Sequence, residues 1–247
     1  MFLKSLHEGA ILVADSHCAP WRTPFVDFLS AIENGKIQTT QLILMGDNFD
    51  LLFGSITQTL ELNREVIALL NRLSNTIEII YLEGNHDFRL VTIFPNVIIV
   101  SLENQPFIMA CCGEKIAFLH GDIHVPTGYK IYTSLIRNKT VLGCLNHIND
   151  WFGGFIINAL SESMQRKNHC KKIDSFETIA HRFVGEKWIT QCDRVVEGHY
   201  HQNQSFDFNE YHYVNLGAFA CNERYYSVKF VQEQISLHEM MFSKEPS

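Results

Sequence analysis

The stretch "YLEGNHDFRL", residues 81–90, joins the end of an apolar run to a turn that carries more polar chemistry than a turn needs. Residues 77–82 are apolar and rich in β-branched side chains, which predicts a strand buried on both faces. A turn needs only a glycine and one Asn or Asp, yet an amide, an imidazole and a carboxylate follow Gly84 together. The surplus groups indicate a functional site, provided that other parts of the chain supply partners.

Four other apolar runs, at 10–14, 41–45, 116–119 and 195–196, also end abruptly in polar residues. The clusters that follow these runs are Asp15-Ser16-His17, Gly46-Asp47-Asn48-Phe49-Asp50, His120-Gly121-Asp122 and Gly198-His199-Tyr200-His201. Ligand sites in α/β sheets lie at the carboxyl ends of the strands. The clusters are therefore expected to converge in space although they are far apart in the chain.

The order of the elements predicts an α/β fold. Residues 23–32 and 55–73 have apolar residues at helical spacing between the first three strands, which implies parallel pairing through crossovers. Further strands are expected at 97–101, 107–111, 211–216, 225–232 and 235–240, the last two as a hairpin. We expect one domain over residues 1–247, built from two mixed sheets flanked by helices. Residues 129–190 look helical throughout and predict an inserted lid or cap.

The composition narrows the class of protein. With 46% apolar residues the chain can bury a sizeable core, and a net charge of −7 gives no general attraction to nucleic acid. No signal peptide and no membrane-spanning run are expected. Seven scattered cysteines without a CxxC pair predict free thiols and a cytoplasmic location.

The twelve histidines are unusual for a chain of this length. His7, His169, His181 and His238 are expected to be ordinary surface or hydrogen-bonded core residues. Most of the others fall in the clusters at the strand ends. Imidazole nitrogens and carboxylate oxygens suit Mn, Fe or Zn, and residues i and i+2 of an extended D-x-H face the same side. Each short motif is weak alone, so the ordered set of five carries the metal-site prediction.

This ordered set resembles the calcineurin-like metallophosphoesterase superfamily, whose pattern runs D-x-H, G-D-x-x-D, G-N-H-[DE], H or G-H, and G-H-x-H. The resemblance covers positions 15–201. It implies a four-layer α/β/β/α sandwich with a dinuclear metal centre. Two divalent ions, bridged by a carboxylate and about 3.5–4 Å apart, would activate a water for in-line attack at phosphorus.

Carried over motif by motif, the resemblance assigns the residues of this site. The first ion would be bound by Asp15, His17, Asp47 and His201, and the second by Asp47, Asn85, His120 and His199. His86 would be catalytic, as a transition-state stabiliser or general acid, with Asp87 as its catalytic support. Asp50 and Asp87 are expected to orient these groups. Mn is the first choice of metal, with Fe or Zn as alternatives.

Within the superfamily, the chain resembles the bacterial UDP-2,3-diacylglucosamine pyrophosphohydrolases of lipid A biosynthesis. The length, the long insertion and the "LGAF" element at 216–219 carry this likeness. It implies release of UMP and 2,3-diacylglucosamine 1-phosphate, and peripheral contact with the inner membrane. Apolar residues at 151–157 would suit acyl chains. The substrate-binding residues that it implies are Asn85, His86, Asp122, Arg166, Lys167, Asn168, Lys171 and Lys172.

One departure leaves alternatives open. That subfamily has Arg in the position of His86, which is the residue more general in the superfamily. The chain could instead act on soluble nucleotides or on other phosphomonoesters and diesters. A non-catalytic scaffold of the same fold is a further alternative, although such chains usually lose ligands. The basic run could also be a solvated surface, and the apolar residues of the cap could serve packing alone.

Overall fold

A computed structural model describes residues 3–122, 134–183, 186–232 and 234–242. Residues 129–133 and 184–185 of the expected cap and Glu233 of the expected hairpin turn lie outside these ranges. The described chain forms two six-stranded mixed sheets and one two-stranded sheet.

The first sheet has the order β14-β13-β2-β3-β5-β7. Its strands are β2 (Ile11–Val13), β3 (Gln41–Leu44), β5 (Glu78–Leu82), β7 (Ile98–Val100), β13 (Arg224–Val231) and β14 (Gln234–Met241). Strands β2, β3, β5 and β7 are parallel, as the strand–helix alternation predicts. Strand β13 pairs antiparallel with β2 and with β14, which confirms the predicted C-terminal hairpin.

The second sheet has the order β1-β8-β9-β10-β12-β11. Its strands are β1 (Lys4–Ser5), β8 (Phe107–Cys111), β9 (Glu114–Leu119), β10 (Arg194–Glu197), β11 (Gln204–Asp207) and β12 (His212–Asn215). Strands β9, β10 and β12 are parallel, so their carboxyl ends lie at one edge. The small sheet pairs β4 (Leu52–Phe53) with β6 (Asp87–Phe88).

Alternating side chains explain why the two sheets stack. In β3, Leu42 and Leu44 face one apolar cluster while Ile43 faces another, and the same alternation occurs in β2 and β5. The inner cluster joins the two sheets, and its members include Leu12, Ile43, Ile80, Met109, Ile116, Phe118, Val196 and Val228. Each central strand is thus buried on both faces, which accounts for its continuous apolar sequence.

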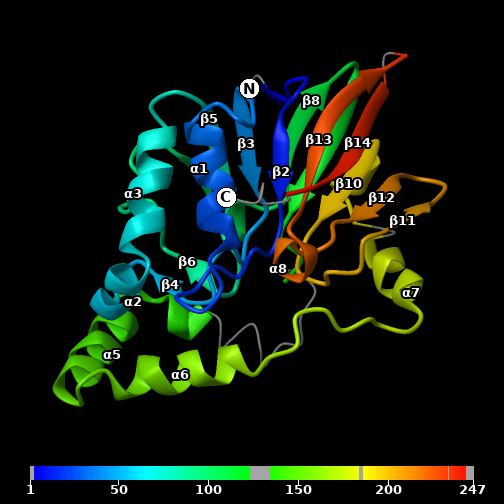
Figure 1. The fold of residues 1–247 in the computed structure, drawn as a ribbon. Helices are drawn as coiled ribbons and strands as arrows, with labels where there is room; N and C mark the ends of the chain where they lie inside the picture. The colour runs from blue at the N-terminus through cyan, green and yellow to red at the C-terminus, as the bar shows by residue number, and fades with distance from the viewer. Residues whose placement is uncertain (1–2, 123–133, 184–185, 233, 243–247) are drawn as a thin grey trace.

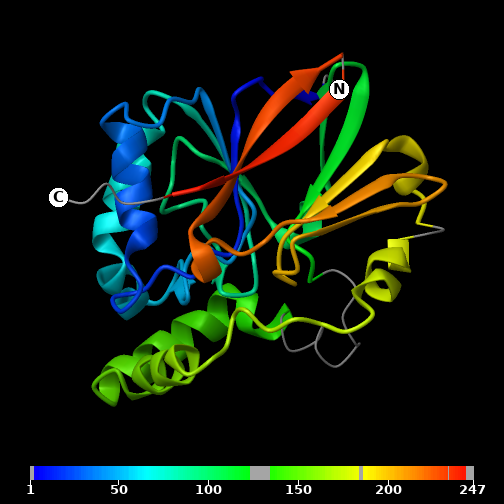
Figure 2. The ribbon, with the colours of Figure 1, turned by 45° about the vertical axis from the view of Figure 1, so that its right-hand side comes forward.

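Helices cover the outer faces of both sheets, as Figures 1 and 2 show. Helices α1 (Pro24–Glu33) and α3 (Arg64–Leu73) pack on the first sheet. Helix α7 (Phe176–Ala180) and the 3-10 turns η2 (His181–Phe183) and η3 (Ile189–Gln191) pack on the second. This arrangement confirms the expected α/β/β/α layers.

The single helix expected at 55–73 is wrong, because the structure has α2 (Thr57–Leu62) and α3 separated at Asn63. The Asn63 side-chain amide donates to the carbonyl oxygens of Leu51 (2.9 Å) and Thr59 (2.8 Å). Asn competes for backbone groups in this way, which explains the break inside an otherwise periodic stretch.

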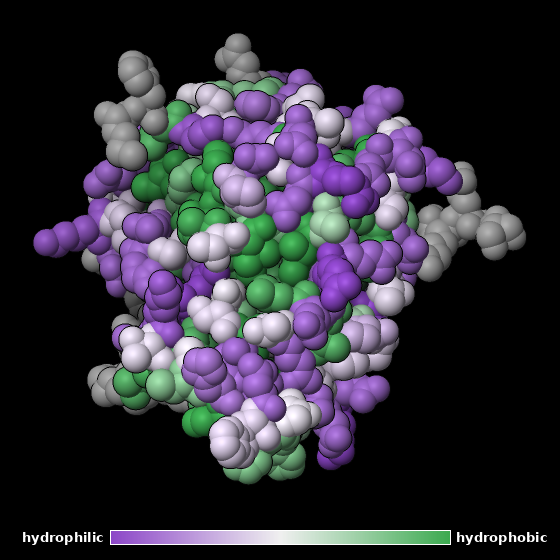
Figure 3. All heavy atoms as spheres, turned by 90° about the vertical axis from the view of Figure 1, so that its left-hand side faces the viewer, coloured by the Kyte–Doolittle hydropathy of each residue, from purple (hydrophilic) through white to green (hydrophobic). Residues whose placement is uncertain are grey.

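Helices α5 (Lys139–Trp151) and α6 (Phe155–Gln165) lie beneath the sheets, beside the small sheet (Figures 1 and 2). Leu142 and Ile157 are buried against Leu51 and Phe88, so one face of this helical pair serves packing. The α5–α6 turn, taken here as residues 151–155 with the adjoining helix ends, exposes Trp151 (87% exposed), Phe152 and Phe155. Figure 3 views the side that carries α2, α3 and α5, where apolar side chains gather among hydrophilic ones.

One cysteine expectation is wrong. Cys170 and Cys221 form a disulfide, with their Cα atoms 5.6 Å apart, while the other five cysteines are free. The two residues are 51 positions apart, so no local spacing pattern indicates their pairing. The bridge joins the segment after α6 to α8 (Phe219–Asn222). Among the described residues, no helix has both the length and the apolar run needed to cross a bilayer.

Candidate metal centre

Backbone pairing continues beyond the strands and brings the first two motifs together. The N–H of Asp15 donates to the carbonyl of Gly46 (3.2 Å), and the N–H of His17 donates to that of Asp47 (3.0 Å). The two loops therefore leave the sheet side by side. From the other sheet, the N–H of His199, which follows β10, donates to the Asp15 carboxylate (2.9 Å) and brings the last motif to the same point.

Asp87 fixes the second and third motifs to each other. Its buried carboxylate accepts hydrogen bonds from the N–H groups of Asp47 (2.9 Å), Asn48 (2.6 Å) and Gly84 (2.9 Å), and from the hydroxyl of Tyr81 (2.5 Å). Burial, aided by the nearby Asp47, raises the pKa of Asp87 to about 7. This side chain is committed to the backbone of both turns, so its contacts suit a positioning role.

We expect Asp87→Asn to lower the free energy of unfolding by about 3 kcal/mol or more, because an amide group would face N–H donors that then lack an acceptor. Urea unfolding measures this loss. Asp174→Asn, at an exposed position, is the control and should change stability by less than about 0.5 kcal/mol. Equal stabilities for the two variants would contradict the role assigned to Asp87.

The backbone of the motifs is unusual. Several non-glycine residues adopt the left-handed conformation, which L-residues rarely adopt without a compensating interaction. They include Asp15 (φ 52°), His17 (φ 45°), Asp47 (φ 49°), His199 (φ 62°) and His201 (φ 59°). All five belong to the ligand set that the sequence predicts. Strain concentrated in this way is typical of a functional site.

Two glycines allow the motifs to approach one another. A Cβ atom on Gly84 would lie 2.2 Å from the Asp47 carboxylate, and one on Gly46 would lie 2.5 Å from the His120 ring. Gly46 also has a φ of +89°. Neither position accepts a side chain, so the glycines of these turns are required by the close packing of the site.

One group of side chains surrounds Asp15. The Nε2 atom of His201 lies 3.1 Å from the Asp15 carboxylate, and ligand atoms of Asp15, His17 and Asp47 lie within 4.8 Å of one another. The Nδ1 atom of His17 is 3.0 Å from the Asp50 carboxylate. Burial, together with the neighbouring imidazoles, holds the pKa of His17 well below its usual range. His17 is therefore neutral and able to bind a cation.

A second group shares Asp47 with the first. The Nε2 atom of His120 lies 3.4 Å from the Asp47 carboxylate, 3.3 Å from Oδ1 of Asn85 and 3.2 Å from Nδ1 of His199. Nδ1–H of His120 donates to the carbonyl of Met45 (3.0 Å), which directs Nε2 inward. Burial favours the neutral form of both side chains. The attraction between the His120 ring and the Asp47 carboxylate outweighs it, raising the pKa of His120 and lowering the pKa of Asp47.

The residues of both groups fit divalent metal ions. Among the described residues, neither ring nitrogen of His17 makes a hydrogen bond, and neither does the Asp50 oxygen that lies 3.0 Å from Nδ1 of His17. Burying these atoms is costly unless another group satisfies them. Imidazole, carboxylate and amide donors suit Mn, Fe or Zn. Asp47 lies in both groups, as a bridging ligand would.

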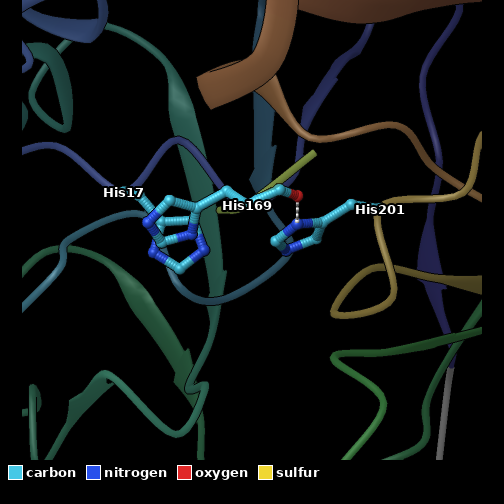
Figure 4. A group of neighbouring side chains, drawn as sticks. All are labelled: His17, His169 and His201. Carbon is cyan, nitrogen blue, oxygen red and sulfur yellow. Dashed lines mark hydrogen bonds between the residues drawn. The ribbon is translucent and has the colours of Figure 1, made fainter. Parts of the chain in front are cut away.

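His169 also belongs to this site, contrary to the sequence-based expectation. Its ring centroid lies 4.0 Å from that of His17, and its carbonyl accepts a 2.5 Å hydrogen bond from Nδ1 of His201 (Figure 4). No motif contains His169, and it lies in the inserted segment. Its position among basic residues gives no sign of its neighbours in space.

His86 lies at the edge of the two groups. Its Nδ1–H donates to the carbonyl of Asp50 (2.8 Å), while Nε2 lies 4.0 Å from Asp47 and 3.3 Å from Nζ of Lys167. A cavity of about 360 Å³ opens beside this site. Its lining residues are His17, Asp47, Lys167, Asn168, His169, Lys171, Ile173, His199, Tyr200 and His201.

The structure separates the remaining predicted substrate residues. Arg166 is exposed and lies 3.4 Å from Glu162, while Lys172 donates to the carbonyl of Gln202. Asp122 is buried 3.6 Å from Arg137, which belongs to none of the five motifs.

Arg137 donates to the carbonyl of Gly84 (2.7 Å) and lies over the ring of Phe88. It therefore supports the turn that carries Asn85 and His86. A lone Arg outside any motif gives no sequence signal for this role.

Comparisons with known proteins show what the chain is similar to. The profile of the calcineurin-like phosphoesterase family matches residues 10–203. A Pseudomonas putida protein named UDP-2,3-diacylglucosamine hydrolase is 28% identical over 142 residues, which cover 56% of this chain and 59% of that protein. An Aliivibrio fischeri protein of the same name is 21% identical over 207 residues, covering 80% and 83%. A solved archaeal phosphodiesterase aligns with a TM-score of 0.46 and 12% identity, over 94% of this chain and 99% of that one.

Proposed function

Since the chain belongs to the calcineurin-like phosphoesterase family, we propose that it hydrolyses the diphosphate of UDP-2,3-diacylglucosamine with two bound divalent ions. It is a metal-dependent phosphoesterase, and the substrate and the number of ions are the proposed parts. Water would add across the diphosphate bond to give UMP and 2,3-diacylglucosamine 1-phosphate. The proposal is supported by the convergence of residues from the five motifs, with Asn85 3.3 Å from His120, in a chain whose relatives bear that substrate in their names.

Two ions held by these residues would lower the pKa of a water and offset charge on the phosphoryl oxygens. The residues around them support the same chemistry. The Nδ1 atom of His86 is held by the Asp50 carbonyl, and its Nε2 atom faces Lys167, a residue that lines the cavity. Lys167 lies 3.3 Å from that nitrogen and would add a positive charge where a diphosphate carries negative charge. Both side chains would thus stabilise the charge that develops at phosphorus.

The exposed apolar residues at the α5–α6 turn are consistent with a lipid-linked substrate. Its turn exposes Trp151, Phe152 and Phe155, and large apolar groups gathered in water favour contact with lipid or another apolar partner. Ile157, by contrast, is buried in the packing of this pair against the body. We propose that the exposed turn makes peripheral contact with a membrane that contains the substrate.

Assays with several substrates test the proposal. With Mn²⁺, UDP-2,3-diacylglucosamine should be hydrolysed at least about 10²-fold more efficiently than bis(p-nitrophenyl) phosphate or cyclic nucleotides, because only it carries both the diphosphate and the acylated sugar of the proposed substrate. Mass spectrometry should identify UMP and the acylated sugar phosphate as products. Preference for a soluble nucleotide would favour the alternative substrate class. Failure to hydrolyse any phosphoester with Mn, Fe or Zn would favour a scaffold.

A further inference from the structure

The segment between α6 and α7 places an imidazole inside the metal centre. The His169 side chain is only 4% exposed, and its ring is tilted by 42° to that of His17. Ligand nitrogens of His17, His169 and His201 lie within 4.8 Å of one another (Figure 4). Three imidazoles this close can share one cation, whereas packing alone does not require three nitrogens to converge.

The ring of His169 lacks the partners that a buried imidazole needs. Neither of its nitrogens has a hydrogen-bond partner in the described structure. The Asp50 carboxylate is 3.8 Å from Nε2, which is beyond hydrogen-bond distance. A buried polar group in this condition is destabilising unless another partner binds it. The two nearby imidazoles identify a metal ion as the partner that fits.

The backbone of His169 also orients a neighbouring ligand. Its carbonyl accepts the Nδ1–H of His201, so Nε2 of His201 keeps its lone pair and points toward Asp15. Metal-bound histidines commonly donate their other N–H to a carbonyl in this way, which fixes the ring and its tautomer. The inserted segment thus contacts the metal centre through both the ring and the carbonyl of one residue.

A disulfide and two backbone hydrogen bonds connect the segment that carries His169 to the loop that carries Asp15. The next residue, Cys170, is bonded to Cys221 in α8. The first amides of α8, those of Phe219 and Ala220, donate to the carbonyl oxygens of Ala14 (2.8 Å) and Asp15 (3.1 Å). The disulfide therefore ties the inserted segment to the loop that carries the first metal ligand.

We propose that His169 is an additional ligand of the ion bound by Asp15, His17 and His201, and that metal binding fastens the inserted segment across the site. The inference rests on the proposed metal centre and is independent of the substrate. It extends the ligand set beyond the motif residues and gives the insertion a direct part in metal binding.

Two measurements test this proposal without an activity assay. Isothermal titration with Co²⁺ should show at least about tenfold weaker binding at one site in His169→Ala than in wild type. Imidazole added to the variant should restore part of that affinity. In a trypsin assay, metal should protect the segment with Arg166, Lys167, Lys171 and Lys172 from cleavage in wild type, and this protection should be lost in His169→Ala. His181→Ala, at an exposed position nearby, is the matched control and should behave as wild type.

The Asp47→Ala variant distinguishes an incorrect role for His169 from an incorrect metal centre. If it weakens Co²⁺ binding while His169→Ala binds and is protected like wild type, the role of His169 is refuted and the proposed centre stands. If Asp47→Ala also binds like wild type, the centre itself is wrong. Circular dichroism checks that each variant is folded. If His169→Ala does not fold, His169→Gln decides the question, because its amide fills the space but binds Co²⁺ weakly.

Discussion

Replacing Asp47 with Ala is expected to remove bound metal and to lower kcat/KM by at least about 10³-fold, or roughly 4 kcal/mol of transition-state stabilisation. Asp47 lies in both groups of candidate ligands, so its loss affects both ions. Oδ1 of Asp47 also accepts a hydrogen bond from the N–H of His86 (2.8 Å), so the substitution removes a contact that holds the turn of the proposed catalytic residue. Metal analysis by mass spectrometry and steady-state kinetics measure the two effects together.

Two further variants complete this experiment. Asp47→Asn keeps an oxygen that can accept the His86 N–H but removes the negative charge, so it should also lose metal while remaining folded. Asp174→Asn changes an exposed acid to the same amide and should keep both metal and activity. A full metal content and normal activity in Asp47→Ala would rule out the two-ion centre.

His86→Ala is expected to lower kcat by about 10²–10³-fold while leaving the metal content unchanged, because His86 lies outside the ligand groups and its Nε2 lies 3.3 Å from Lys167, which lines the cavity. The loss reflects the removal of one group that stabilises charge at phosphorus. Single-turnover kinetics and metal analysis on the same preparation distinguish a slower chemical step from a loss of bound metal. His181→Ala again provides a histidine control.

His86→Arg tests the departure from the subfamily pattern. If the substrate is the same, an arginine should retain more activity on UDP-2,3-diacylglucosamine than alanine does, since it also donates to phosphoryl oxygens. Loss of metal from His86→Ala would contradict the proposed role, because it would place His86 among the ligands.

The strand ends could be predicted from sequence because each buried strand and its polar cluster are continuous in the chain. The apolar run before Asp15 and the run before Gly84 both form central strands, and the His17 and His86 rings of their clusters have centroids 5.2 Å apart. Parallel strands put their carboxyl ends at one edge, so chain order alone implies convergence. The break at Asn63 cannot be predicted from helical spacing, because the hydrogen bonds of the Asn63 side chain to the backbone override a favourable apolar pattern.

The sequence by itself determined the layered fold and the set of polar groups at the strand ends, because local periodicity and short motifs specify them. Only the tertiary structure decided that His169 joins them, that Cys170 pairs with Cys221, and that Arg137 supports the His86 turn. These contacts link the insertion to the core across long sequence separations. Such contacts depend on how the insertion packs against the core, and neither the periodicity nor the residue spacing of the sequence indicates that packing.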